Sequence, residues 1–177
     1  MGTDYTEELL ERSLAGDRAA FEQLIADLVE PGYRLACGML LDRHEAEDAV
    51  QEATLKAWLK LSTFRRGADP RPWFLTIVAN HCRDVRRRPW WSVLRGDAFA
   101  GEAAPPARDP ALGIDLRRAL ETLGASDRAL LVLHYYLDLP LEEVARVLRI
   151  SPTAAKSRLY RVLRRLRNHL EPSEALA

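Results

Sequence analysis

The segment 152–170 constrains the fold most strongly, because its apolar residues recur at helical spacing while small polar and basic residues occupy the opposite side. Between Arg146 and Arg167 the chain has eight basic residues and no acidic one. The apolar stripe consists of Ala155, Leu159, Val162, Leu163, Leu166 and Leu170, and the opposite side of Ala154, Ser157, Arg158, Arg161, Arg164 and Arg165. This pattern predicts an α-helix that is buried on one side and exposed on the other.

A shorter amphipathic segment, 141–148, precedes this helix across a tight turn. Ser151 is a favourable capping residue for the second helix, and Pro152 fits its first turn. Two such helices, the second of them cationic, are typical of a helix-turn-helix, whose second helix enters the major groove of DNA. The alternatives are an ordinary helix with a solvated basic face and, less favoured because its apolar face lacks aromatics, a helix on a membrane surface.

Proline and glycine divide the chain into two parts. The segment 89–113 holds four of the ten prolines and three glycines without a helical period. Helical periods occur on both sides of it, and no stretch shows strand alternation. The expected helices are 5–15, 17–30, 32–41, 44–61, 72–88, 114–123, 126–137, 141–148 and 152–170. We therefore predict an all-α fold of two small helical domains, 1–88 and 114–177, joined by a flexible linker at 89–113, with the helix-turn-helix in the second.

Composition excludes several classes of protein. The two cysteines, Cys37 and Cys82, are too few for a disulfide framework and do not form a metal-ligand spacing with the histidines. The N-terminus lacks the apolar core of a signal peptide, and no apolar run is long enough to cross a membrane. We expect a soluble, cytoplasmic protein without a metal or cofactor.

The segment 45–61 carries a second surface of interest. One side of this expected helix is apolar and predicts a core face, whereas the other carries Asp48, Gln51, Glu52, Leu55 and Leu59. Leucines among carboxylates indicate a face that docks on another protein, although single exposed apolar residues also occur on ordinary surfaces.

A loop and a basic helix follow. The loop 62–71 leads into a helix with Trp73 and Phe74 at its start and four arginines near its end. Aromatics interleaved with arginine suit unstacked single-stranded bases. Core packing of the aromatics, and basic residues that complement a helix dipole, explain the same pattern equally well.

Taken together, these segments resemble the extracytoplasmic-function (ECF) group of bacterial sigma factors in the sigma-70 family, which retain only the second and fourth conserved regions. EDAVQEATLKAW, followed by Phe64 and by W-F-L-x-x-I-x-x-N from Trp73 to Asn80, resembles the second region. LEEVARVLRIS, followed by TAAKSRLYR, resembles the fourth. The resemblance covers about residues 15–170 and implies a transcription initiation factor without enzyme activity that brings core RNA polymerase to promoters and helps to melt them.

The resemblance also implies roles for individual residues. Binding to polymerase would involve the clamp helices of its largest subunit and the flap region, with Asp48, Gln51, Glu52 and Leu55 on the clamp side. Residues matching those that bind the minus-10 element are Phe64, Arg65, Arg66, Gly67, Ala68, Asp69, Asn80, Arg83, Arg86 and Arg87. Residues matching those that bind the minus-35 element are Ser151, Thr153, Lys156, Ser157, Arg158 and Arg161.

The resemblance further implies an anti-sigma factor as a partner. The sequence departs from the family at Arg149, where a glycine is common before the turn of the helix-turn-helix, so a strained or rebuilt turn is expected. A helix-turn-helix regulator that acts without polymerase is the alternative function, but it leaves the face around Asp48 unexplained. A small helical enzyme is a weaker alternative, because no nucleophile, metal set or phosphate loop accompanies the carboxylates.

Overall fold

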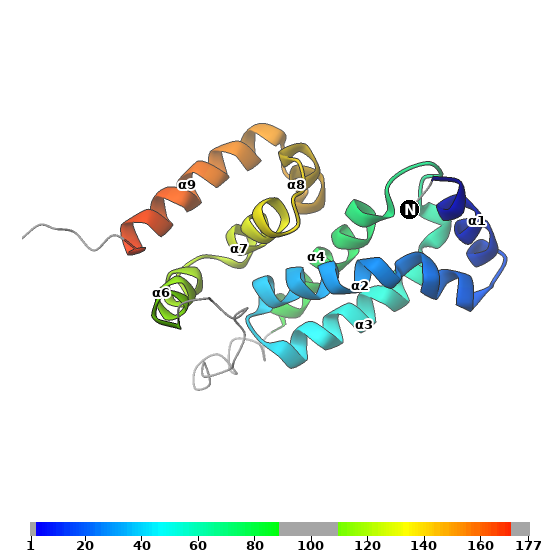
Figure 1. The fold of residues 1–177 in the computed structure, drawn as a ribbon, viewed down its shortest axis with the longest axis horizontal. Coiled ribbons are helices and arrows are strands. Elements are labelled where there is room, and N and C mark those ends of the chain that lie inside the picture. Colours follow the sequence, from blue (N-terminus) through cyan, green and yellow to red (C-terminus); the bar gives the residue numbers. More distant parts are fainter. Residues whose placement is uncertain (1–2, 89–109, 171–177) are drawn as a thin grey trace, which may run out of the picture.

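The computed structural model of the protein describes residues 3–88 and 110–170, and every regular element in these two ranges is a helix (Figure 1). The N-terminal lobe comprises α1 (Thr3–Leu14), α2 (Arg18–Leu40), α3 (Arg43–Leu59), the short 3₁₀ helix η1 (Leu61–Thr63) and α4 (Pro70–Arg87). The C-terminal lobe comprises α6 (Pro110–Glu121), α7 (Ala125–Leu131), the π-helical turn η2 (Val132–Tyr136), α8 (Leu141–Leu148) and α9 (Pro152–Leu170). The predicted all-α fold with two helical domains is confirmed. Most of the predicted linker lies outside the described residues.

Helix α2 is the centre of the N-terminal lobe and contacts α1, α3 and α4. Aspartates define where helices begin: the Asp17 carboxylate accepts a hydrogen bond from Ala20 N at 3.1 Å at the start of α2, and Asp42 accepts one from Glu45 N at 2.9 Å at the start of α3. The core of the lobe includes fully buried side chains such as Leu35, Met39, Phe74 and Val78.

Helix α2 differs from its prediction. The sequence predicted a break at Pro31, but one helix of 23 residues runs through it. Proline removes the N–H that would bond the carbonyl of Asp27, which weakens the helix locally. Burial of α2 on both sides of this point outweighs the loss: Leu28 and Leu35 are in the core, and Gly32 packs so closely on Phe74 that a Cβ at Gly32 would lie 2.9 Å from Cε1 of the ring.

The helix-turn-helix of the C-terminal lobe forms as predicted. Arg149 ends α8 in the left-handed conformation, with φ 57° and ψ 46°, where the sequence led us to expect a strained turn. Ser151 caps α9 by accepting a hydrogen bond from Ala154 N at 3.1 Å. The predicted apolar stripe of α9 is buried at Ala155, Leu159, Val162 and Leu166, whereas Leu170, at the end of the helix, is 42% exposed, contrary to its predicted place in the core.

The two lobes pack against each other. Helix α8 contacts α4, and α7 with η2 contacts α2, so that α7 and α8 lie between α9 and the N-terminal lobe (Figure 1). One continuous cluster of buried apolar side chains extends from Leu9 in α1 to Leu159 in α9. A smaller cluster between α6 and α9 includes Ala119, Leu123, Val162 and Leu166. The sequence did not predict that the lobes share a core.

Candidate functional site

Helix α3 presents the face predicted from its sequence. Its alanines and Val50 are buried, while Asp48, Gln51 and Glu52 are exposed on the other side. Leu55 is 52% exposed and Leu59 70%, so both present apolar area to solvent beside the carboxylates. This face combines apolar area with negative charge, the composition that favours binding of a basic protein surface.

A cavity of about 440 Å³ adjoins this face between α3 and α4. Its lining is mainly acidic or polar and consists of Glu45, Asp48, Ala49, Gln51, Glu52, His81, Val85 and Arg88. Burial and the nearby carboxylates of Asp42 and Asp48 raise the pKa of Glu45. The lining has three carboxylates, Glu45, Asp48 and Glu52, against one arginine, Arg88, so its net negative charge would stabilise a cationic side chain from a partner.

The loop between η1 and α4 does not present Phe64 as a free stacking surface. Phe64 is only 8% exposed and contacts Trp73 edge to face, with ring centroids 5.2 Å apart. Residues 65–69 are exposed, and Asp69 begins α4 by accepting a hydrogen bond from Arg71 N at 2.8 Å. Of the two aromatics that the sequence offered for stacking on bases, Trp73 packs on Phe64 and Phe74 is fully buried.

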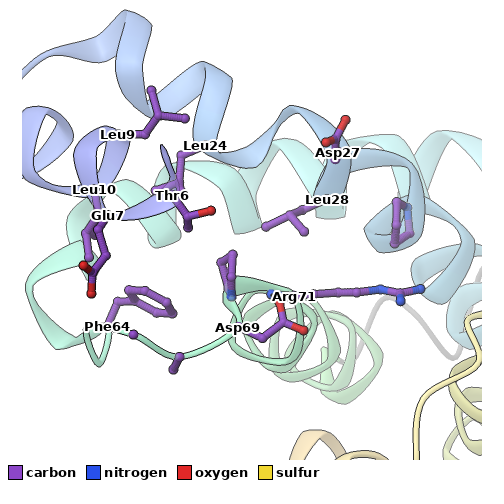
Figure 2. A pocket seen from close by; sticks show the side chains of 14 residues that line it. Thr6, Glu7, Leu9, Leu10, Leu24, Asp27, Leu28, Phe64, Asp69 and Arg71 are labelled. Atoms are coloured by element: carbon purple, nitrogen blue, oxygen red, sulfur yellow. Dashed lines mark hydrogen bonds between the residues drawn. The ribbon is translucent and has the colours of Figure 1, made fainter. Parts of the chain in front are cut away.

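Phe64 instead lines a cavity of about 660 Å³ between α1, α2 and this loop (Figure 2). The lining residues are Thr6, Glu7, Leu9, Leu10, Leu24, Asp27, Leu28, Pro31, Phe64, Gly67, Ala68, Asp69, Pro70 and Arg71. In Figure 2 the Phe64 ring lies below Glu7 and Thr6, and Arg71 extends away from them. A cavity of this size that combines apolar side chains with polar and charged ones has the general character of a small-ligand site.

Sequence reasoning missed the contribution of α1 to this cavity. Thr6, Glu7, Leu9 and Leu10 line it, yet α1 lies outside the motifs that identified the loop. The only signal in the sequence was the amphipathic period of α1, which predicts burial but not the partner of the helix.

The basic residues of α4 lie elsewhere, and none of Asn80, Arg83, Arg86 and Arg87 lines the cavity next to Phe64. Asn80 Oδ1 accepts a hydrogen bond from Arg83 Nη1 at 2.5 Å, and Arg83 Nη2 donates to the carbonyl of Val147 in α8 at 3.4 Å. Burial and then Arg149 lower the pKa of Arg83. The predicted minus-10 residues therefore fall into two groups, one at the loop and one on α4, where Arg83 contacts the C-terminal lobe.

The basic face of α9 is exposed. Ser151, Thr153, Lys156, Ser157 and Arg161 are all open to solvent, and a shallow groove of about 390 Å³ is lined by Ser157, Tyr160, Arg161 and Arg164. Tyr160, which the sequence analysis did not select, is 63% exposed within this groove.

Arg158 differs from the other predicted residues of α9. Its side chain is 31% exposed, and its Nε atom lies 3.5 Å from Oδ1 of Asp127 in α7. Arg165 also approaches Asp127, at 3.8 Å. Arg158 thus helps to hold α9 against α7, in addition to any contact with DNA.

We also searched residues 3–88 and 110–170 for metal sites, reactive thiols and membrane-spanning helices. No group of three or more histidine, cysteine or acidic side chains there could hold a metal ion. Burial raises the pKa of the Cys82 thiol to about 12, so this group stays protonated and unreactive. None of the helices in the same two ranges has the length and apolar character needed to span a membrane.

Comparison with known proteins accounts for both lobes. The Sigma-70 region 2 family model matches residues 24–92, and the Sigma-70, region 4 model matches residues 114–166. An isolated helix-turn-helix regulator would account only for the second match. Together the two models cover more than half of the chain.

Individual relatives agree with this result. The chain is 32% identical over 168 residues to the ECF RNA polymerase sigma factor SigM of Mycobacterium tuberculosis, covering 90% of this chain and 81% of that protein. It is 28% identical over 153 residues to the RNA polymerase sigma factor SigV of Bacillus subtilis, covering 86% and 92%. It is also 29% identical to the probable RNA polymerase sigma factor RfaY of Xanthomonas campestris, but spans only 43% of its length.

Solved structures are similar over most of the chain. The sigma factor RpoE of Bartonella quintana, in complex with the anti-sigma factor NepR, matches with a TM-score of 0.72 and 26% identity over 87% of this chain and 98% of that one. CnrH, in complex with the cytosolic domain of CnrY, shares the fold with a TM-score of 0.66 and 23% identity over 92% and 94%. Both conserved regions, in the expected order, and relatives along most of its length place this chain in the ECF group of sigma-70 family sigma factors, which direct RNA polymerase to promoters.

Proposed function

We propose that the α3 face is the surface by which this sigma factor binds core RNA polymerase, at the clamp helices of the largest subunit. The observation that carries this proposal is the exposure of Leu55 and Leu59 beside Asp48 and Glu52 on one side of a helix whose other side is core. The carboxylates steer a basic partner to the face, and the leucines supply buried apolar area once it is bound. The cavity at Glu45 would accept a cationic side chain from that partner.

The cavity beside Phe64 is the proposed site for an unstacked base of the minus-10 element. Its apolar walls would cover the faces of a base, and Thr6, Glu7 and Asp69 would supply polar contacts to its edge. Such a cavity excludes a base that is still paired and stacked in a duplex. Binding would therefore favour the melted strand, at a cost in unstacking of a few kcal/mol per base.

The groove of α9 is the proposed contact with the minus-35 element. Arg161, Arg164 and Ser157 line it together with Tyr160, and all four side chains are exposed. Arginines reach phosphates or guanine edges, and a serine hydroxyl can bond either. Helix α9 follows the turn of a helix-turn-helix, which is the element that enters the major groove in this motif.

The remaining parts of the proposal concern setting and partners. The chain would act in the cytoplasm as a binding subunit of polymerase with no catalytic activity of its own. An anti-sigma factor is a proposed partner, because the similar sigma factor RpoE of Bartonella quintana was solved in complex with the anti-sigma factor NepR.

Co-purification with bacterial core polymerase that lacks any sigma factor tests the proposal. Wild-type chain should form a stable complex, and the double variant Asp48→Lys, Glu52→Lys should not, because two attractive charges become repulsive at the centre of the face. A matched control is Glu22→Lys, Glu142→Lys, which makes the same change in net charge at exposed positions of α2 and α8. Loss of binding in both variants, or in neither, would show that the α3 face is not the docking site.

A further inference from the structure

Two arginines of α9 converge on one carboxylate of α7. Nε of Arg158 lies 3.5 Å from Oδ1 of Asp127, and Nη1 of Arg165 lies 3.8 Å from Oδ2 of the same side chain. The arginines are seven positions apart, so they lie on the same side of α9, about two turns from each other. Both oxygens of Asp127 therefore face cations of the helix that carries the basic face.

Asp127 is well placed to offset the charge of these arginines. Helix α9 has no acidic residue of its own, so the opposing charge comes from another helix. Asp127 lies in the first turn of α7, where the positive end of the helix dipole stabilises a carboxylate. Its side chain is 22% exposed, and those of Arg158 and Arg165 are 31% and 47% exposed, so water screens the two pairs only in part.

Further contacts hold the same side of α9 toward the end of the helix. Nη2 of Arg165 donates to the carbonyl of Thr122, directly after α6, at 3.1 Å. Since Nη1 of Arg165 faces Asp127, both ends of its guanidinium fork are occupied within the lobe. Nε2 of His169 lies 3.4 Å from Oγ1 of Thr122. One side of α9, which we call the restrained side, is thus fastened to the end of α6 and the start of α7.

The restrained side determines how the rest of α9 is oriented. The exposed groove, whose lining includes Ser157, Arg161 and Arg164, lies about a quarter of a turn around the helix from it. The contact of Arg158 with Asp127 at Nε also confines its Nη atoms, the fork that binds guanine edges and phosphates. An arginine held in this way loses less conformational freedom on a DNA geometry that it fits, and it cannot follow the phosphates of every sequence.

We propose that Asp127 is a positioning residue for recognition of the minus-35 element. By restraining Arg158 and Arg165, it withholds two cations from indiscriminate contact with phosphates and fixes the orientation in which the groove meets base edges. Discrimination between promoter and random DNA then depends on a carboxylate that does not itself contact DNA. This inference rests on the α9 contact of the proposed function.

Binding of the full chain to two DNA duplexes, measured by fluorescence anisotropy, tests the proposal. One duplex carries a sequence enriched from a random pool by the wild-type chain, and the other carries a scrambled sequence of the same length and composition. Asp127→Asn should bind the scrambled duplex several-fold more tightly at low salt, with a salt slope steeper by up to about 0.9 for each released arginine. The ratio of the two affinities should fall about tenfold. A purely structural role would instead weaken binding to both duplexes alike and lower Tm, and this result would overturn the proposal.

Two further variants separate position from charge. Glu142→Gln makes the same change in net charge at an exposed site on α8 and should leave the affinity ratio unchanged. Asp127→Glu keeps the carboxylate and should keep most of the discrimination and the wild-type salt slope.

A double-mutant cycle shows whether Asp127 acts through the arginines. In a chain that carries Arg158→Gln and Arg165→Gln, the substitution Asp127→Asn should no longer change the salt slope or the affinity ratio. A change as large as that in the wild-type background would mean that the carboxylate acts on DNA directly, and the proposal would be wrong.

The outcomes distinguish this inference from the proposed function. If the wild-type chain enriches no sequence from the pool, the α9 contact itself is contradicted, and the inference falls with it. If the wild-type chain discriminates and Asp127→Asn discriminates equally well, or changes no more than Glu142→Gln, only the role of Asp127 is refuted.

Discussion

The Nζ atom of Lys56 in α3 lies 2.6 Å from the Nδ1 atom of His81 in α4. His81 is 6% exposed, and burial first and the charge of Lys56 second lower the pKa of its imidazole below the ordinary value of 6.5. The neutral ring accepts a hydrogen bond from the ammonium group, whereas a protonated ring would turn an N–H toward a cation. The contact between α3 and α4 at this point therefore depends on an uncharged histidine.

This dependence predicts a loss of stability in mild acid. The unfolded chain takes up a proton at His81 near the ordinary pKa, while the folded chain resists it, so the unfolded state binds more protons as the pH falls. The stabilisation is complete above about pH 6.5 and is lost as the pH falls toward and through the lowered pKa of the folded state. Calorimetry between about pH 8 and about pH 5 should show a Tm that falls less steeply in His81→Gln than in wild type. His44→Gln, at an exposed position, is the control, and equal slopes in all three chains would contradict this role of His81.

The sequence predicts a feature well when the residues of one helix determine it, and poorly when the feature depends on how several elements pack together. The faces of α3 and α9 were predicted well, because the spacing of residues within one helix determines which side is buried. The burial of Phe64 was harder to predict, because it depends on the position of Trp73, which follows an irregular loop.

Features between the lobes left no signal in the sequence. The hydrogen bond from Arg128 in α7 to the carbonyl of Gly38 in α2 joins residues 90 positions apart, and an arginine in an amphipathic helix is normally expected to face solvent. Arg83 was predicted to bind DNA from its place in a motif, but its bond to Val147 depends on how α8 packs on α4. Tertiary packing of this kind is decided by shape and charge across two lobes and not by local periodicity.

The proposed base cavity predicts a specific effect at Phe64. Phe64→Leu keeps an apolar side chain in the core but removes the ring that lines the cavity, so polymerase binding should persist while promoter melting falls. Permanganate footprinting of the melted strand measures this. Phe21→Leu is the matched control, because Phe21 makes a similar edge-to-face contact, with Trp58 at 5.1 Å, and does not line the cavity. Equal melting by wild type and Phe64→Leu would remove the ring from the proposed mechanism.

The left-handed backbone at Arg149 predicts a stabilising substitution. A residue with a Cβ at φ 57° is strained, and glycine is not, so Arg149→Gly should raise the free energy of unfolding by about 1 kcal/mol. Arg149→Ala removes the same charge without relieving the strain and serves as the control. Chemical denaturation of both variants separates the two effects. Equal gains from glycine and alanine would attribute the gain to charge, through Arg83, and not to backbone conformation.

The basic face of α9 predicts how binding to minus-35 DNA depends on salt. Each arginine that neutralises a phosphate adds about 0.9 to the slope of log affinity against log salt. Arg161→Ala should weaken binding and reduce the slope by about this amount without loss of stability, because Arg161 is exposed in the groove. Arg158→Ala should in addition lower Tm, since it removes the ion pair with Asp127. Arg167→Ala, on the same helix but outside the groove, is the control. Fluorescence anisotropy at several salt concentrations measures all three, and a slope unchanged in Arg161→Ala would place the DNA contact elsewhere on the lobe.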